Sequence, residues 1–124
     1  MNKRYHAADI KKGYNIPDFK KIANAYNLKY IKTKNKTIEV RFSTEDSFRT
    51  DPNVLSKLFL AIEDYIDRIG IADTIGVATH QDIENTVSII KNSTSSSLDI
   101  ECHFHNDSSS AAYNAYTALI NGCT

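Results

Sequence analysis

The sequence predicts an α/β fold, built from repeated strand-then-helix units around a parallel sheet. Three short apolar stretches are each followed by a stretch in which apolar residues recur at helical spacing. Strands that alternate with single helices call for parallel pairing and right-handed crossovers. The composition agrees with a globular domain, since 41% of the 124 residues are hydrophobic and 24% are charged.

Residues 1–36 and residues 37–124 differ in pattern. In the first segment, Pro17, Ile22 and Tyr26 have the spacing of one short helix, and a strand is predicted after it at 28–31. A Lys-rich run then ends this segment. We therefore predict a helix-strand segment of different or divergent origin at 1–36, and about three strand-helix units at 37–124.

These units follow one another in a regular order. The strands are predicted at residues 38–43, 69–72 and 98–104, and the helices at 51–66, 79–91 and 109–120. Pro52 suits the first turn of the first helix, Thr79 or Asp82 can cap the second, and Gly122 is expected to stop the third. A complete eight-stranded barrel takes about 250 residues, so a barrel sequence of this length would be a fragment.

The third predicted strand carries a candidate metal site. Glu101, His103 and His105 share one face of the strand, because side chains alternate with period two. Two imidazoles so placed can reach one metal ion. The same spacing also fits two ordinary hydrogen-bonded histidines, and the pattern alone leaves both interpretations open.

The other two strand ends offer groups that can hold a substrate. Arg41 and Ser43 share a face of the first strand, where a guanidinium and a hydroxyl can bind a carboxylate. A structural ion pair of Arg41 with Glu45 or Glu101 explains the same residue equally simply. Thr74 follows the second strand and can donate to a ligand oxygen, although a capping threonine would look the same.

Charge and hydropathy exclude several classes of partner. Fifteen Lys and Arg residues balance fifteen Asp and Glu residues, so no basic field exists to hold nucleic acid. No apolar stretch has the length of a signal peptide or membrane span, and a cytoplasmic location is expected, with mitochondrial and nuclear addresses left open. Cys102 and Cys123 show no CxxC spacing and are expected to be buried reduced thiols.

Three linked motifs resemble those of homocitrate synthases. They are the segments 41–49 (RFSTEDSFR), 70–79 (GIADTIGVAT) and 99–107 (DIECHFHND), and the similarity covers residues 37–124. Synthases of isopropylmalate and citramalate carry similar second and third motifs, and Arg41 before Phe42-Ser43 favours the homocitrate branch.

The resemblance implies a (βα)8 TIM barrel with one divalent metal, which is zinc, magnesium or manganese. It implies that His103 and His105 are metal ligands, that Arg41, Ser43 and Thr74 contact the substrate, and that Glu101 is catalytic beside them. The implied reaction is the condensation of acetyl-CoA with 2-oxoglutarate in lysine biosynthesis, catalysed by an acyltransferase.

The chain departs from the family pattern in ways that bear on activity. The family's first-strand motif, an Asp-x-x-Arg-Asp or Arg-Glu segment with a Gln shortly after, is missing from residues 1–124, and Ser108-Ser109-Ser110 replaces its usual Thr-Gly. We therefore expect a partial TIM-barrel catalytic domain that is inactive alone and self-associates through exposed edges. A noncatalytic or chimeric α/β module is the alternative.

Residues 5–34 resemble, over a short stretch, a segment of thiamine-diphosphate enzymes of the acetolactate synthase type. The Gly-Asp-Gly and paired Asn residues with which that family binds magnesium and diphosphate do not occur in this segment. No thiamine diphosphate is therefore expected.

Overall fold

The computed structural model describes residues 39–124, in which strands and helices alternate along the chain. In order, the elements are β1 (Arg41–Thr44), η1 (Ser47–Arg49), α3 (Pro52–Ile62), η2 (Glu63–Tyr65), β2 (Arg68–Asp73), α4 (His80–Ser93), β3 (Asp99–Phe104) and α5 (Ala111–Ile120). The helix and strand predicted within residues 1–36 lie outside the described part. The division of the chain near residue 36 therefore stays a prediction.

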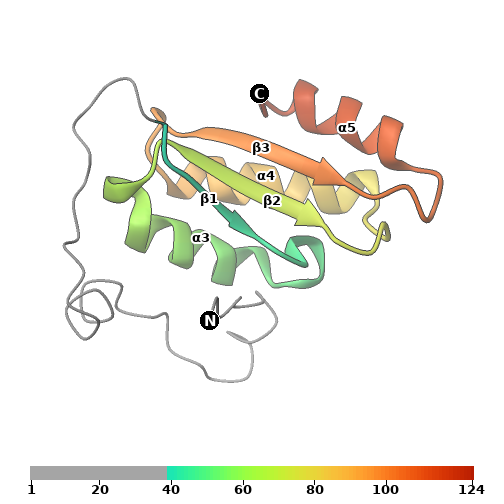
Figure 1. Cartoon of the computed structure of the whole chain (residues 1–124), viewed down its shortest axis with the longest axis horizontal. Coiled ribbons are helices and arrows are strands. Elements are labelled where there is room, and N and C mark those ends of the chain that lie inside the picture. Colours follow the sequence, from blue (N-terminus) through green and yellow to red (C-terminus); the bar gives the residue numbers. More distant parts are fainter. Residues whose placement is uncertain (1–38) are drawn as a thin grey trace.

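The three strands form one parallel sheet in the order β1-β2-β3, with their arrows running in the same direction in Figure 1. Ser43, Gly70 and Glu101 lie side by side across the three strands. Within residues 39–124, only the central strand β2 is paired on both sides. The predicted α/β class with a parallel sheet is confirmed.

One face of the sheet carries the apolar core. Ile69, Ile71 and Ile100 point to this face, and α4 passes behind the strands, with α3 and α5 beside it (Figure 1). Burying each large aliphatic or aromatic side chain stabilises the fold by about 1.5–3 kcal/mol. The core consists of Leu55, Phe59, Ile62, Ile66, Ile69, Ile71, Ala78, Ile83, Val87, Ile90, Ile100, Ala118 and Cys123.

The predicted helix starts are formed by local hydrogen bonds. The Asp51 carboxylate accepts from the Asn53 amide at 2.9 Å, with Pro52 in the first turn. At α4, the Thr79 hydroxyl accepts from the Asp82 amide at 3.3 Å, and the Asp82 carboxylate accepts from the Thr79 amide at 2.9 Å. Both residues proposed for this cap therefore take part, as the two halves of a capping box.

Several boundaries differ from the prediction, among them that of the first strand, which covers Arg41–Thr44 instead of residues 38–43. The helix expected to reach residue 66 leaves α-helical geometry after Ile62 and continues as the 3-10 turn η2, which leads to the buried Ile66. The last helix begins at Ala111 rather than Ser109, because Ser109 has a φ of 60° that no helix admits. Gly122 follows α5 with a φ of 90°, as expected for a glycine that stops a helix.

Candidate functional site

The open face of the sheet gathers the polar residues that the helices leave uncovered. Neighbouring strands place Arg41, Arg68 and Asp99 in one row across the sheet, and Ser43, Gly70 and Glu101 in the next. His103 stands opposite Ala72 in a third row, further along the strands. Residues paired in register point to the same side of a sheet, so these three rows make up a single surface, here called the polar face.

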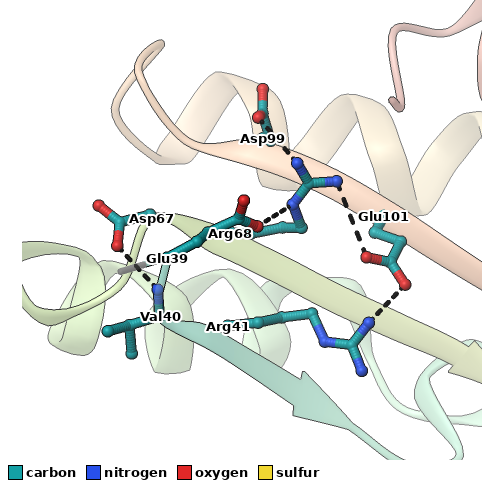
Figure 2. A network of polar contacts seen from close by, with 7 residues as sticks. All are labelled: Glu39, Val40, Arg41, Asp67, Arg68, Asp99 and Glu101. Atoms are coloured by element: carbon teal, nitrogen blue, oxygen red, sulfur yellow. Dashed lines mark hydrogen bonds and ion pairs between the residues drawn. The ribbon is translucent and has the colours of Figure 1, made fainter. Parts of the chain in front are cut away.

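Arg41 and Glu101 are joined across the polar face. The Arg41 Nη1 donates to the Glu101 Oε1 at 2.5 Å, and the two side chains are 51% and 36% exposed (Figure 2). This is one of the two structural ion pairs that the sequence left open for Arg41. The guanidinium remains half-exposed, so a carboxylate from solution can compete with Glu101 for it.

Arg68 is a member of this network that the sequence analysis missed. Figure 2 shows its guanidinium between three carboxylates: it lies 2.5 Å from Glu39, 3.4 Å from Asp99 and 3.8 Å from Glu101. The hydrogen bond to Glu39 and the nearby negative charges raise the pKa of Arg68, against the opposing effect of burial. Arg68 lies two positions before Gly70 and four before Ala72 in β2. The period-two alternation of the strand is therefore the signal that could have placed Arg68 on the polar face.

Glycine at position 70 makes room for the Ser43 side chain. A β-carbon at this position would collide with the Ser43 Oγ and lie 2.9 Å from the Ser43 Cβ. The serine hydroxyl therefore lies directly over the backbone of β2, beside the row that carries Glu101. Any larger residue at 70 would push Ser43 away from the centre of the polar face.

Thr74 lies in the loop after β2, where its hydroxyl holds the loop after β1. The Thr74 Oγ1 accepts from the Asp46 amide at 2.7 Å, and Asp46 adopts the left-handed region with a φ of 56°. The Asp46 carboxylate in turn binds Arg49 through two oxygens, at 2.7 Å and 2.6 Å. The hydroxyl proton of Thr74 is still available for donation to a ligand.

His103 and His105 form a pair at the end of β3. Their ring centroids are 5.0 Å apart with the planes inclined at 58°, and both side chains are exposed. Imidazole nitrogens suit zinc, so the pair fits as two ligands of one ion. Among the described residues, however, no group of three or more His, Cys, Asp or Glu side chains could hold a metal.

The loop that carries His105 rests on the loop after β2. The buried carboxylate of Asp73 accepts from the amides of Val77 and Ala78, each at 3.0 Å, while the Asp73 carbonyl accepts from the His105 amide at 3.3 Å. Gly76 has a φ of 66°, and a β-carbon there would lie 2.8 Å from the Asp107 amide nitrogen. The second and third motifs are therefore in direct contact at this point.

A family model described as HMGL-like matches residues 8–124, which is most of the chain. The chain belongs to the HMGL-like family. This family has the TIM-barrel fold, so the predicted partial barrel of strand-helix units is confirmed for residues 39–124. The match begins at residue 8, so it includes most of residues 5–34. The resemblance of those residues to a thiamine-diphosphate enzyme stays a prediction.

This chain is similar to several curated synthases over almost three quarters of its length. It is 48% identical over 92 residues to the mitochondrial homocitrate synthase of Schizosaccharomyces pombe, covering 73% of this chain and 22% of that relative. It is 46% identical over 90 residues to the cytosolic homocitrate synthase isozyme of Saccharomyces cerevisiae, covering 72% and 21%. The predicted resemblance to homocitrate synthases is confirmed.

A sibling synthase also matches. The 2-isopropylmalate synthase of Heliobacterium modesticaldum is 40% identical over 93 residues, which cover 72% of this chain and 18% of that relative. The chain thus spans about one fifth of the length of these HMGL-like relatives.

Within residues 39–124, no helix is long and apolar enough to cross a membrane.

Proposed function

We propose that this chain carries part of the 2-oxo acid and metal site of a homocitrate synthase-like acyltransferase, which condenses acetyl-CoA with 2-oxoglutarate. The observation that supports the proposal is the polar face. Arg41, Ser43 and Glu101 meet on it from two strands, and His103 continues it toward His105. Parallel α/β folds bind their substrates at the carboxyl ends of strands, where the histidine pair stands.

In this proposal His103 and His105 hold a divalent metal, with further ligands from outside the described residues. When bound, such a metal polarises the keto group of a 2-oxo acid toward attack by a carbon nucleophile. Arg41 binds a substrate carboxylate, while Ser43 and Thr74 donate hydroxyl protons to its oxygens. Glu101 orients Arg41 through their 2.5 Å contact and, in the row next to His103, is the proposed catalytic carboxylate.

The charge of the polar face explains why metal and substrate would bind together. Two guanidiniums, of Arg41 and Arg68, face three carboxylates, of Glu39, Asp99 and Glu101, so this network is net negative. A dicarboxylate would be repelled by that surplus, whereas a dication on the histidine pair would reverse the sign. We therefore expect 2-oxoglutarate to bind measurably only when metal is present.

Metal titration tests the histidine pair. Calorimetry with Zn²⁺ or Mn²⁺ should give one binding event, and His103→Ala should weaken it by about tenfold or more. The matched control is His80→Ala, which removes a histidine at the start of α4 and should leave the affinity unchanged. Equal binding by wild type and His103→Ala would refute the metal site.

Substrate specificity separates the homocitrate branch from its sibling. With metal present, 2-oxoglutarate should bind more tightly than a 2-oxo acid with an apolar side chain, because only the former offers a second carboxylate. Arg41→Gln should remove most of that preference, since a neutral amide cannot form a bidentate ion pair. A preference for the apolar acid would favour the isopropylmalate or citramalate alternative, which the 40% identity to a 2-isopropylmalate synthase supports.

Turnover tests the expectation that the chain is inactive alone. Homocitrate formation from acetyl-CoA and 2-oxoglutarate should be undetectable with the isolated chain, and its mass in solution should exceed that of a monomer. Detectable turnover would contradict the proposed incompleteness of the site. Absence of both metal and 2-oxo acid binding would favour the noncatalytic module, which the absence of a three-ligand cluster from residues 39–124 supports.

A further inference from the structure

Two thiols meet on the helix-covered side of the sheet, opposite the polar face. Cys102 lies in β3 and Cys123 follows α5, and their sulfur atoms are 3.4 Å apart in a hydrogen bond. Both are free thiols, and both pack against the apolar core. Twenty-one positions separate them in the sequence, so only the packing of α5 against β3 brings them together.

The backbone holds the two cysteines in place. The Cys123 amide donates to the Ala118 carbonyl at 3.0 Å, which ties it to the last turn of α5. The next amide, of Thr124, donates to the Ile100 carbonyl of β3 at 2.9 Å. One anchor is made by Cys123 itself and the other by its neighbour Thr124, so the end of the chain is held against β3 with the two sulfurs 3.4 Å apart.

A cation stands beside Cys123. Lys91 of α4 donates from its Nζ to the Asn121 carbonyl at 3.2 Å, and it occupies the space that a β-carbon on Gly122 would fill. The hydrogen bond with Cys102 and the charge of Lys91 lower the pKa of Cys123, against the opposing effect of burial. Thiolates are the nucleophilic form of cysteine, so Cys123 is the more reactive of the pair.

We propose that Cys102 and Cys123 form a redox-active dithiol, which a hydroperoxide converts into an intramolecular disulfide. The Cys123 thiolate attacks the terminal oxygen of the hydroperoxide and the O–O bond breaks. Hydroxide leaves from hydrogen peroxide, or alkoxide from an organic hydroperoxide, and Cys123 becomes a sulfenic acid. The Cys102 sulfur then attacks the Cys123 sulfur, and its proton departs with the sulfenic hydroxyl as water. The peroxide is reduced, both thiols are oxidised, and the proposal does not depend on the proposed synthase function.

The disulfide would link β3 to the end of α5. Cys102 lies between Glu101 and His103, whose side chains point to the polar face, so the bond would tether the strand that carries the candidate site. A thiol such as glutathione would reverse it by exchange.

Peptide mass spectrometry of the oxidised full chain tests the proposal. No Lys or Arg follows Lys91, so trypsin leaves both cysteines in the single peptide 92–124. About one equivalent of hydrogen peroxide should make this peptide lighter by two hydrogen atoms and abolish its reaction with thiol reagents. A bond between chains would instead join two such peptides, and that product, or two unlinked oxidised cysteines, would overturn the proposal.

Single variants test which thiol reacts first. In Cys102→Ser, Cys123 should accumulate as a sulfenic acid that a 1,3-dione traps, whereas in Cys123→Ser the oxidation of Cys102 should be at least about tenfold slower. Lys91→Gln should slow oxidation of the wild-type pair several-fold, and Lys57→Gln, an exposed lysine on α3, is its matched control. Equal rates in the two cysteine variants would overturn the assignment of Cys123 as the nucleophile.

Equilibration with glutathione keeps the test valid if a variant folds poorly, because it uses the unaltered chain. The disulfide should be favoured by about tenfold or more in the folded chain over the same chain in denaturant, since the fold raises the effective concentration of one thiol near the other. An equal disulfide fraction in both states would show that the fold does not pair the thiols, and would overturn the proposal.

Discussion

The two faces of the sheet are made from alternate residues of the same strands, yet different forces hold them. On the covered face, Ile69, Ile71 and Ile100 are at most 3% exposed and pack under the helices. On the polar face, Arg41 and Glu101 remain 51% and 36% exposed and are held by ion pairs. The first face carries the stability of the fold, whereas the second carries the candidate site residues and contributes little to stability.

The largest effect is expected from a cavity in the covered face. Phe59 on α3 is fully buried, and Phe59→Ala should reduce the free energy of unfolding by about 3–5 kcal/mol, measured by urea denaturation. The matched control is Leu60→Ala on the same helix, at a side chain that is 51% exposed, which should change it by less than about 1 kcal/mol. Similar losses in both variants would mean that the covered face is not the core.

The next effect comes from crowding the polar face. Gly70→Ala introduces a β-carbon that collides with Ser43, so we expect a loss of about 1–3 kcal/mol in the free energy of unfolding. Adding Ser43→Gly removes the obstructing side chain and should recover most of that loss in a double-mutant cycle. Additive effects of the two substitutions would show that Ser43 does not lie over Gly70.

A smaller effect is expected at the cap of α4, the helix behind the sheet. Thr79→Ala removes the hydroxyl that accepts from the Asp82 amide and should cost about 1 kcal/mol of unfolding free energy. Thr79→Ser keeps an accepting hydroxyl and should stay close to wild type. If serine and alanine destabilise equally, the hydroxyl is not the capping group.

The smallest effect is expected for the ion pair on the polar face. Arg41→Gln should change the free energy of unfolding by less than about 1 kcal/mol, because exposed pairs are screened by water. Salt at about 1 M shortens the screening length to about 3 Å and should shrink the difference between wild type and Arg41→Gln further, while leaving the Phe59→Ala loss in place. A larger stability loss at Arg41 than at Phe59 would reverse the comparison between the faces.

Much of the fold could be predicted because it follows from short-range patterns. Alternation in the strands separates Ile69 and Ile71 from Gly70, and Thr79 with Asp82 marks the start of α4 within four residues. The same alternation places Arg41 with Ser43, and Glu101 with His103. The backbone of Ser109 was misjudged, since a serine rarely adopts a positive φ and nothing nearby in the sequence signals it.

The sequence by itself therefore determined the α/β class, the order of the elements, and the sides of the strands that carry the candidate residues. Only the tertiary structure decided which groups meet: Arg41 with Glu101, Arg68 with three carboxylates, and Cys102 with Cys123. The side of a strand on which a residue lies, and the period of the apolar pattern, are local properties that three or four residues encode. A contact between side chains tens of positions apart depends on strand register and helix packing, which arise only when the whole core assembles.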